Sequence, residues 1–282
     1  MTTLDQFDFI VIGGGSGGVR AARIAASLGA TVAIIEDTHW GGTCVNVGCV
    51  PKKMYHYVAS ARDEIELARA YGWQVKVDGL DWSVFHQAKN NEINRLQQIY
   101  RNMLNNTGAQ VIDGFATLLD AHRVQVGEQT YHAKHILLAV GCTPVMPDIA
   151  GIEHAIMSDQ LFAQATLPRN MLVFGGGYIA CEMASTYHKL GVDVRLITRG
   201  QFLKHFDRQT TDFLKTQLHA EGLHMQEQLS ITAIAKTEQG LTVSLSDGSC
   251  DQVETVLIAT GRKPRFEGLG LDKLGIKRDS QG

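Results

Sequence analysis

The sequence predicts an α/β fold with two parallel-sheet modules, because one pattern of strand, glycine-rich turn, helix and strand occurs twice along its 282 residues. The first copy begins near Phe7 and the second near Leu172. A length of this order is typical of two domains, and 44% hydrophobic residues is ample for two packed cores. We therefore expect right-handed parallel sheets with helices on their faces.

The first copy is complete in the sequence. A β-prone run over 7–12 leads into the block Gly13-Gly14-Gly15-Ser16-Gly17-Gly18, and an alanine-rich amphipathic stretch continues to Leu28. A second apolar run over 32–35 ends before Glu36. Strand, turn, helix, strand and acid in this order predict a dinucleotide site; the alternative is a glycine-rich turn without a ligand.

Three glycines of this block have separate geometric tasks. Gly13 gives the tight turn, Gly15 lets the backbone approach a pyrophosphate, and Gly18 lets the helix pack closely on the strand. Free N–H groups at the helix start would bind the anion. Glu36 stands where a carboxylate usually binds the ribose hydroxyls.

The second copy runs through Gly175-Gly176-Gly177, a helix to Leu190 and an apolar strand over 192–197. Each module also closes on an apolar run, which ends in Ala-Val-Gly at Gly141 and in Ala-Thr-Gly at Gly261. Two dinucleotide sites are therefore predicted. The first module is the longer one, because it also contains a pair of cysteines.

The two copies differ where coenzyme specificity is set. Thr198 aligns with Glu36, and Arg199 follows it, so the second module lacks a carboxylate and offers a guanidinium to a 2′-phosphate. We predict NADPH rather than NADH there, with Lys204 as a second phosphate contact. The alternative is that Arg199 and Lys204 form a solvated basic turn.

The run Gly41-Gly42-Thr43-Cys44-Val45-Asn46-Val47-Gly48-Cys49-Val50-Pro51-Lys52-Lys53 indicates a redox-active disulfide. A regular helix holds residues five apart at roughly 8 to 9 Å, whereas a disulfide needs Cα atoms within about 7 Å. Gly48 and Pro51 permit or impose the necessary distortion. If a helix begins after Pro51, Lys52 or Lys53 can lie near Cys49 and favour its thiolate. The alternatives are a structural disulfide and two buried thiols.

Composition excludes several classes. A net charge of −3 without a basic block disfavours nucleic acid as a partner, and no segment resembles a leader or a membrane span. Five cysteines make an odd count without a dense framework, which fits a reducing, cytoplasmic setting. We expect Cys142, Cys181 and Cys250 to be buried small side chains, and we predict no metal site.

With two dinucleotide motifs bracketing GGTCVNVGCVPKK, the chain resembles the pyridine nucleotide-disulfide oxidoreductases, and among them the glutathione reductases, over essentially its whole length. The resemblance implies FAD in the first Rossmann-like module and NADPH in the second. Hydride would pass from nicotinamide to flavin and then to the disulfide. Cys49 would face the flavin as the charge-transfer thiolate, while Cys44 attacks the substrate disulfide to form a mixed disulfide that Cys49 resolves.

The resemblance also assigns roles outside the cysteine pair. Lys52 would lie near the flavin and pair with Glu182, where the alternative is two unrelated surface charges. Tyr178 would cover the nicotinamide pocket, where the alternative is simple packing. Arg262 resembles a coenzyme contact, where the alternative is an exposed arginine. The complete set of expected cofactor contacts is Gly13, Gly15, Ser16, Gly17, Gly18, Glu36, Gly42, Thr43, Lys52, Gly141, Gly175, Gly177, Ala180, Arg199, Lys204, Gly261 and Arg262.

Arg23 and Tyr100 match positions that line the disulfide substrate pocket in glutathione reductases, which favours glutathione disulfide. Two positions depart from that pattern, because Arg20 replaces a frequent alanine and Met103 a frequent asparagine. The first adds positive charge and the second removes a hydrogen-bonding amide. Another low-molecular-weight disulfide is therefore an alternative substrate.

The resemblance stops at Gly282, so the chain looks like an N-terminal fragment, with a natural truncation as the alternative. We expect an FAD module over 1–143, an NADPH module over 144–264, and the start of a truncated central region over 265–282. The missing interface domain would form a homodimer and supply an acid-base histidine, which none of the eleven histidines here can replace. We expect weak FAD retention and little turnover from this chain alone. The alternative function is a nucleotide-binding remnant without catalysis.

Overall fold

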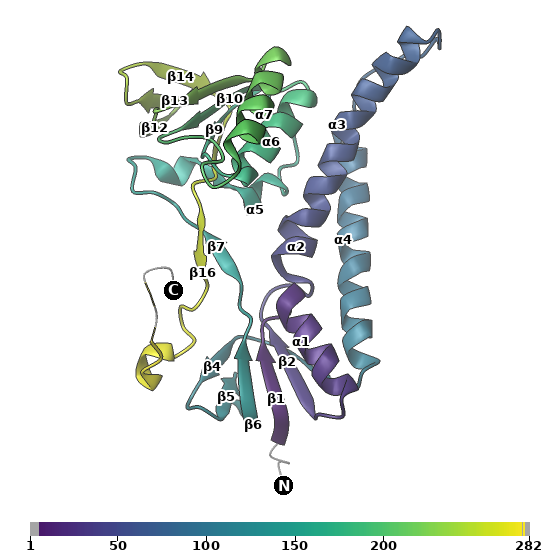
Figure 1. The fold of residues 1–282 in the computed structure, drawn as a ribbon, viewed down its shortest axis with the longest axis vertical. Coiled ribbons are helices and arrows are strands. Elements are labelled where there is room, and N and C mark those ends of the chain that lie inside the picture. Colours follow the sequence, from purple (N-terminus) through teal and green to yellow (C-terminus); the bar gives the residue numbers. More distant parts are fainter. Residues whose placement is uncertain (1–5, 278, 280–282) are drawn as a thin grey trace. The chain divides into compact units, whose positions relative to one another are not determined.

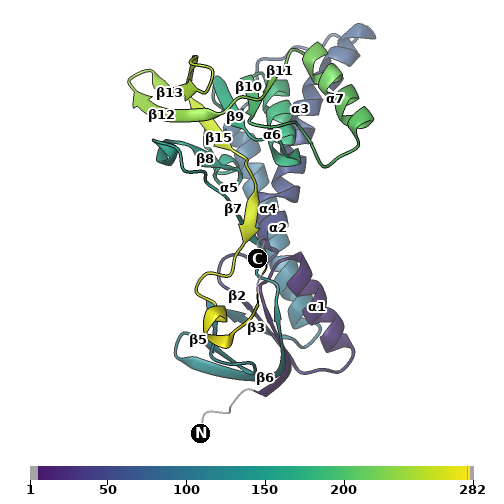
Figure 2. The ribbon, with the colours of Figure 1, turned by 60° about the vertical axis from the view of Figure 1, so that its left-hand side comes forward.

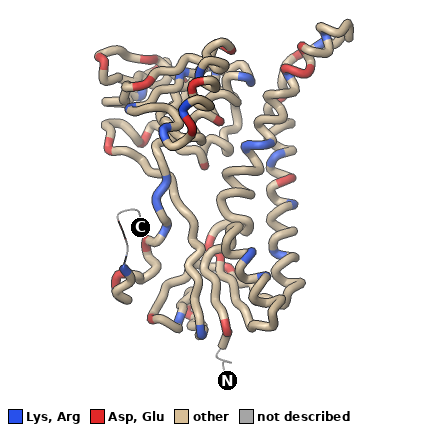
Figure 3. The backbone as a smooth tube through the Cα atoms, viewed as in Figure 1, with Lys and Arg blue, Asp and Glu red and all other residues tan. Residues whose placement is uncertain are grey.

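The structure is a computed structural model in which residues 6–277 and 279 are described. The chain forms two compact units, each assembled from separate segments. Unit 1 contains 1–51, 88–143 and 263–282, and unit 2 contains 52–87 and 144–262. Residues 278 and 280–282 of the predicted central region lie outside the described residues. Basic and acidic residues are interspersed along the chain in both units (Figure 3).

Unit 1 is built on a six-stranded sheet in the order β3-β2-β1-β6-β5-β4. Its strands are β1 (Gln6–Ile12), β2 (Val32–Glu36), β3 (Gln110–Asp113), β4 (Ala116–Leu118), β5 (Arg123–Val126) and β6 (Gln129–Leu138). The first strand pairs in parallel with β2 and β6, with Ile12 opposite Ile35 and Leu138. The predicted parallel strands are therefore present. The pairings of β5 with β4 and with β6 are antiparallel.

One face of this sheet is covered by helix α1 (Ser16–Ser27), as Figures 1 and 2 show. Val19 and Ala22 of α1 pack with Val11, Ile34 and Leu104 in one buried cluster. On the other side of the sheet, strand residues such as Ile10 and Ile35 pack with Leu269 and Leu271. Both leucines follow β16 (Arg262–Pro264), and Leu271 is the first residue of η2 (Leu271–Leu274). Residues 269–271 thus contribute to the core of unit 1.

Three helices continue from the first module: α2 (Gly42–Val47), α3 (Cys49–Ala70) and α4 (Trp82–Asn105). The expectation that a helix begins after Pro51 is wrong, because α3 begins at Cys49. A proline fits in the first helical turn, where its missing N–H has no partner within the helix.

Unit 2 has a five-stranded parallel sheet in the order β11-β10-β9-β15-β8. Its elements are η1 (Ile152–His154), β8 (Ile156–Met157), α5 (Ser158–Leu161), β9 (Asn170–Phe174), α6 (Tyr178–Lys189), β10 (Asp193–Thr198), α7 (Arg208–Ala220), β11 (His224–Glu227) and β15 (Thr255–Ile258). All residues of β15 and the last four of β9 are buried, which matches strands covered on both faces.

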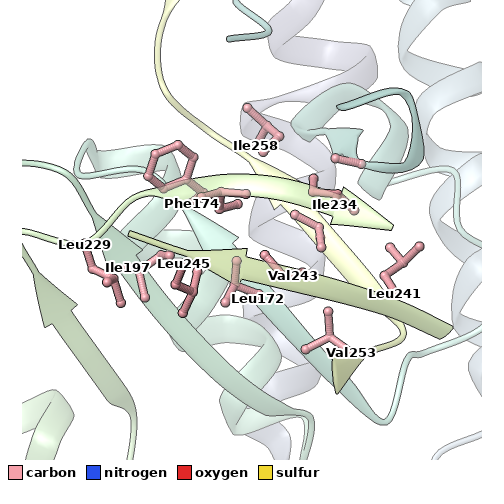
Figure 4. Packing of buried hydrophobic residues seen from close by; sticks show 13 residues of the cluster. Leu172, Phe174, Ile197, Leu229, Ile234, Leu241, Val243, Leu245, Val253 and Ile258 are labelled. Atoms are coloured by element: carbon pink, nitrogen blue, oxygen red, sulfur yellow. The ribbon is translucent and has the colours of Figure 1, made fainter. Parts of the chain in front are cut away.

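The second face of this sheet is covered by a three-stranded antiparallel sheet of β12 (Ile231–Thr237), β13 (Gly240–Leu245) and β14 (Cys250–Val253). Its inward residues pack on Leu172, Phe174 and Ile258 of the parallel sheet (Figure 4). Our expectation of helices on both faces was wrong here. The alternation of buried and half-buried residues along β13 is the period of a strand with one inward face.

Five aromatic side chains form a second core within unit 2. The Tyr55 ring contacts those of Trp82, Phe85, Phe162 and Tyr187 at centroid distances between 4.9 and 5.8 Å. Burial raises the pKa of Tyr55 to about 12, although the neighbouring Tyr187 opposes this in part, and burial raises the pKa of Tyr187 as well. Neither hydroxyl has a hydrogen-bond partner of ordinary geometry among the described residues.

Two connecting segments, β7 (Cys142–Pro144) and β16, pair as a two-stranded sheet. Within unit 1, the Arg265 amide donates to the Gly141 carbonyl at 3.0 Å; within unit 2, the Val145 amide donates to Gly261 at 2.9 Å. The carbonyl of each predicted closing glycine, Gly141 or Gly261, therefore accepts a backbone hydrogen bond from a residue of its own unit. The ligands predicted for the modules 1–143 and 144–264 stay predictions.

Candidate functional site

The first glycine turn lies at the carboxyl end of β1. Gly13 has φ +115°, and a Cβ there would lie 2.2 Å from the Ala139 carbonyl oxygen. A Cβ on Gly18 would lie 1.9 Å from the Gly13 carbonyl oxygen, which confirms that this glycine lets the helix approach the strand. Side chains of any size are excluded at both positions.

The start of α1 is open to a ligand. Gly15 is the N-cap residue, no side chain caps the helix, and a Cβ on Gly17 would meet nothing within 4 Å. The first N–H groups of a helix have no partner within it, and they carry the positive end of its dipole. Ser16 and Gly17 are exposed at this end. The site therefore has the properties that an anionic group requires.

Glu36 ends β2 beside this turn and is only 9% exposed. Its Oε1 accepts hydrogen bonds from the Thr38 amide, the Thr38 hydroxyl and the His39 amide, and its Oε2 accepts from the Gly14 amide at 2.6 Å. The carboxylate thus fixes the glycine turn, a task that we did not predict. Oε2 keeps acceptor capacity for a ribose hydroxyl, because a carboxylate oxygen accepts about two hydrogen bonds.

A pocket of about 40 Å³ adjoins Gly13 and Glu36, and Arg265 forms part of its wall. The Arg265 guanidinium donates to both carboxylate oxygens of Asp37, at 3.1 and 2.5 Å. The uncapped helix, the close-packed glycines and the acid at the strand end fit a dinucleotide such as FAD.

The cysteine segment begins directly against this turn. Gly41 and Gly42 have φ +93° and +60°, and a Cβ on Gly42 would lie 2.6 Å from the Gly15 Cα. The Gly41 amide donates to the Gly14 carbonyl at 2.9 Å. Two glycines in left-handed conformations therefore allow backbone to pack on backbone, which places the start of α2 beside the start of α1.

The two cysteines flank a break between helices. Cys44 is half-buried in α2 and Cys49 is exposed at the start of α3. Gly48 separates the helices, and a Cβ there would lie 2.8 Å from the Thr43 carbonyl oxygen. The predicted distortion is confirmed. No disulfide links the five cysteines, all of which are described.

Lys52 and Glu182 form the predicted ion pair within unit 2, with Nζ and Oε1 2.8 Å apart. Their side chains are 33% and 39% exposed, so solvent screens the pair in part. Lys53 instead lies over the Tyr57 ring, 4.8 Å from its centroid. The alternative of two unrelated charges is thereby removed.

The remaining cysteines divide into two kinds. Cys181 is buried in α6, and burial, with a smaller contribution from the Glu182 charge, raises its pKa to about 11. Its thiol is therefore inert near neutral pH. Cys142 and Cys250 are exposed, so our expectation that they are buried was wrong. Cys250 lies on β14, an edge strand of the antiparallel sheet, which explains its exposure.

The second glycine turn repeats the first. A Cβ on Gly175 would lie 2.3 Å from the Ala259 carbonyl oxygen, and Gly177 is the uncapped N-cap residue of α6. Ala180 stands where the first copy has Gly18 and is fully buried. This helix start has the same open N–H groups as the start of α1.

Strand β10 ends at Thr198, which is 5% exposed, and Arg199 follows it on the surface. Arg199 makes no ion pair with the described residues, and Lys204 is also exposed. The nearby Glu227 accepts from Lys215 at 3.0 Å and from the Phe202 amide at 2.8 Å. The Arg199 guanidinium therefore remains available to an anion.

A pocket of about 250 Å³ lies along this turn and includes Tyr178, Ser158 and Arg262 in its wall. Tyr178 is 55% exposed and begins α6, so it is not a packing residue. Arg262 is half-buried, with Nη1 3.4 Å from Asp159 Oδ1. Asp159, a residue without a sequence signal, thus orients the arginine that we predicted as a coenzyme contact.

The predicted substrate residues lie on two helices of unit 1. Arg20 and Arg23 are exposed one turn apart on α1, and neither forms an ion pair with a described residue. Tyr100 of α4 is half-buried against the cluster that contains Val19 and Ala22, and Met103 is half-buried one turn further along.

Among residues 6–277 and 279, no three or more His, Cys, Asp or Glu side chains are grouped so that they could hold a metal ion. No helix within 6–277 is both long and apolar enough to cross a membrane.

The family model of the pyridine nucleotide-disulphide oxidoreductases matches residues 7–282. This chain belongs to that family. The chain is 39% identical over 278 residues to a glutathione reductase of Burkholderia cepacia, covering 98% of this chain and 62% of that protein. It is 40% identical over 274 residues to a glutathione reductase of Nostoc, covering 96% and 60%.

Among solved structures, the chain is similar to RclA of Escherichia coli, an HOCl-induced flavoprotein disulfide reductase determined as a mutant in complex with copper(II). The TM-score is 0.86 at 27% identity, with 99% of this chain and 62% of that chain covered. The chain thus spans about three fifths of the length of these relatives.

Proposed function

We propose that this chain is the nucleotide-binding and dithiol-bearing part of an FAD-dependent disulfide reductase that uses NADPH and acts on glutathione disulfide. The observation that carries the proposal is the packing of the Cys44 helix start against the first glycine turn. A Cβ on Gly42 would lie 2.6 Å from the Gly15 Cα, so the helix that contains Cys44 begins in contact with the predicted dinucleotide-binding turn. Membership in the family and similarity to two glutathione reductases support the same reaction.

FAD fits unit 1, where α1 would hold the pyrophosphate and Glu36 a ribose hydroxyl. NADPH fits unit 2, where α6 would hold the pyrophosphate and Arg199 the 2′-phosphate. When bound, FAD would supply the transfer of a hydride's two electrons between the nicotinamide and the protein disulfide. For the whole protein we propose a homodimer.

The chain's own thiols would perform the exchange. The Cys44 thiolate attacks one sulfur of the substrate disulfide, and the first thiolate product leaves. The Cys49 thiolate then attacks the Cys44 sulfur, which releases the second product and leaves a Cys44–Cys49 disulfide. Two electrons and two protons, supplied by NADPH and solvent, restore both thiols.

Lys52 would contribute a fixed positive charge near this centre, because Glu182 holds its ammonium at 2.8 Å. Tyr178 would cover the nicotinamide pocket of unit 2, since it is exposed at the rim of the pocket there. Both roles follow from the family resemblance together with these positions.

An anaerobic titration of FAD-loaded protein with NADPH tests the proposal. We expect a long-wavelength absorbance band in the wild type, its persistence in Cys44→Ser, and its loss in Cys49→Ser. Cys250→Ser, which changes an exposed thiol on another element, is the matched control and should behave like the wild type. Loaded wild-type protein without the band would favour a nucleotide-binding remnant.

The substrate is tested by mixing the NADPH-reduced protein with different disulfides. Glutathione disulfide should reoxidise it faster than cystine or a neutral dialkyl disulfide, because Arg23 and Tyr100 match positions that line the disulfide pocket in glutathione reductases. Equal rates with all three would remove glutathione specificity from the proposal and leave the reductase reaction.

A further inference from the structure

Asn46 lies between the two cysteines and is the buried polar residue of helix α2, with 8% of its surface exposed. Asparagine is a poor helix former, and burial of its amide is unfavourable unless every polar atom is paired. Hydrophobic side chains flank it in Val45 and Val47. A buried amide here therefore calls for a physical reason.

The Asn46 amide makes three hydrogen bonds. Nδ2 donates to the Trp40 carbonyl at 3.1 Å and to the Gly42 carbonyl at 2.8 Å, while Oδ1 accepts from Gln97 Nε2 at 2.7 Å. The first two bonds close the chain from 40 to 46 into a ring. The third ties that ring to α4, which lies beside α2 in unit 1 (Figures 1 and 2).

The ring contains Gly41 and Gly42, the residues whose left-handed conformations bring the cysteine segment against Gly15. Trp40 is itself anchored, because its Nε1 donates to Asp113 Oδ1 at 2.8 Å. Arg101, one turn after Gln97 on α4, donates to both carboxylate oxygens of Asp113. Two side chains of one helix thus hold the segment that begins the redox loop.

We propose that Asn46 and Gln97 are positioning residues that set the equilibrium between the dithiol and the disulfide of Cys44 and Cys49. The inference rests on the proposed redox role of these cysteines. A disulfide requires its Cα atoms within about 7 Å, so the free energy of closing it depends on how freely α2 moves. With α2 tied to α4, the Cys44 sulfur stays at a higher effective concentration around Cys49.

The test uses the 282-residue chain without added cofactor, equilibrated in buffers of reduced and oxidised dithiothreitol. Oxidation forms one S–S bond between Cys44 and Cys49 and transfers two electrons and two protons to the oxidised dithiothreitol, which becomes the dithiol. Alkylation followed by peptide mass spectrometry measures this pair separately from the other three cysteines.

Gln97→Met removes the amide donor at nearly constant volume, and Gln98→Met makes the same change at the next position, which is exposed. We expect Gln97→Met to lower the equilibrium constant for disulfide formation by about fivefold, because releasing α2 from α4 lowers the effective concentration of the Cys44 sulfur around Cys49. Asn46→Ala should lower it further, and Gln98→Met should leave it unchanged. Gln97→Asn, which keeps an amide, should recover part of the loss.

Unchanged or increased equilibrium constants in Gln97→Met and Asn46→Ala, with both chains folded by circular dichroism, would overturn the inference. If Asn46→Ala does not fold, Gln97→Met decides alone, because it leaves both ring-closing bonds in place. A wild-type chain that forms no Cys44–Cys49 disulfide would instead overturn the proposed function, so the two failures are distinguishable.

Discussion

The Gly18→Ala substitution tests the close contact of helix and strand at the first glycine turn. A Cβ at this position would lie 1.9 Å from the Gly13 carbonyl oxygen and 3.1 Å from Val11 Cγ1. Contacts below 3.0 Å essentially never occur, so α1 must move away from the strand by about 1 Å. The obstructing atom belongs to the backbone and cannot rotate aside.

The magnitude follows from the comparison with Gly17→Ala. Overpacking of this kind costs about 1 to 3 kcal/mol, whereas replacing a helical glycine by alanine gains up to about 1 kcal/mol. A Cβ on Gly17 would meet nothing within 4 Å, so Gly17→Ala has the gain without the clash. The difference in unfolding free energy between the two variants therefore isolates the clash, and we expect about 1 to 3 kcal/mol.

Hydrogen exchange of β1 and β6 in increasing urea measures this difference, because it reports unit 1 separately from unit 2. Gly18→Ala should open these strands more readily than the wild type, and Gly17→Ala should match or exceed the wild type. Equal protection in the two variants would refute the reasoning, because it would mean that the helix does not approach the strand as described.

Three further predictions concern other parts of the chain. Arg199→Glu should weaken NADPH binding about tenfold or more and leave NADH binding nearly unchanged, measured by calorimetry; an unchanged preference would remove Arg199 as a 2′-phosphate contact. Glu182→Gln should lower the unfolding free energy by less than about 1 kcal/mol, with a smaller effect in 1 M salt, because the pair is partly solvated; urea unfolding at two salt concentrations checks this, and a loss insensitive to salt would contradict it. Above pH 10 unit 2 should lose stability, because an unfolded tyrosine ionises near pH 10 while Tyr55 keeps its proton to about pH 12. The folded state then binds more protons than the unfolded state, so stability falls as pH rises. Absorbance at 295 nm should show Tyr55 and Tyr187 ionising last, and early ionisation of all seven tyrosines would contradict their burial.

Local patterns explain why much of the fold could be predicted. The turns at Gly13 and Gly175 follow short apolar strands and precede amphipathic helices, so strand, turn and helix are all specified within thirty residues. Both copies have a glycine at the turn because the backbone there approaches a carbonyl group of another strand end: Gly13 lies against Ala139, and Gly175 lies against Ala259. The Lys52–Glu182 pair came from family resemblance, because no local pattern links residues so far apart in the chain.

The features that we missed depend on contacts between distant segments. The antiparallel sheet over 231–253 had a signal in the Asp247-Gly248 turn and in the alternating pattern of β13. The sequence signal at Asn46 was weaker. A polar residue between two valines can be exposed to solvent, or it can be buried with its amide hydrogen-bonded, and the sequence does not distinguish the two. Its partner Gln97 lies 51 residues away on another helix, so only the three-dimensional structure brings the two amides together.

The most direct test of the central claim is a count of the thiols that NADPH releases in the oxidised chain, made by differential alkylation and peptide mapping with and without FAD. The account predicts two new thiols per chain, at Cys44 and Cys49, and only when FAD and NADPH are both present. Release at Cys142 or Cys250, release that does not need FAD, or no release from FAD-loaded protein would contradict it.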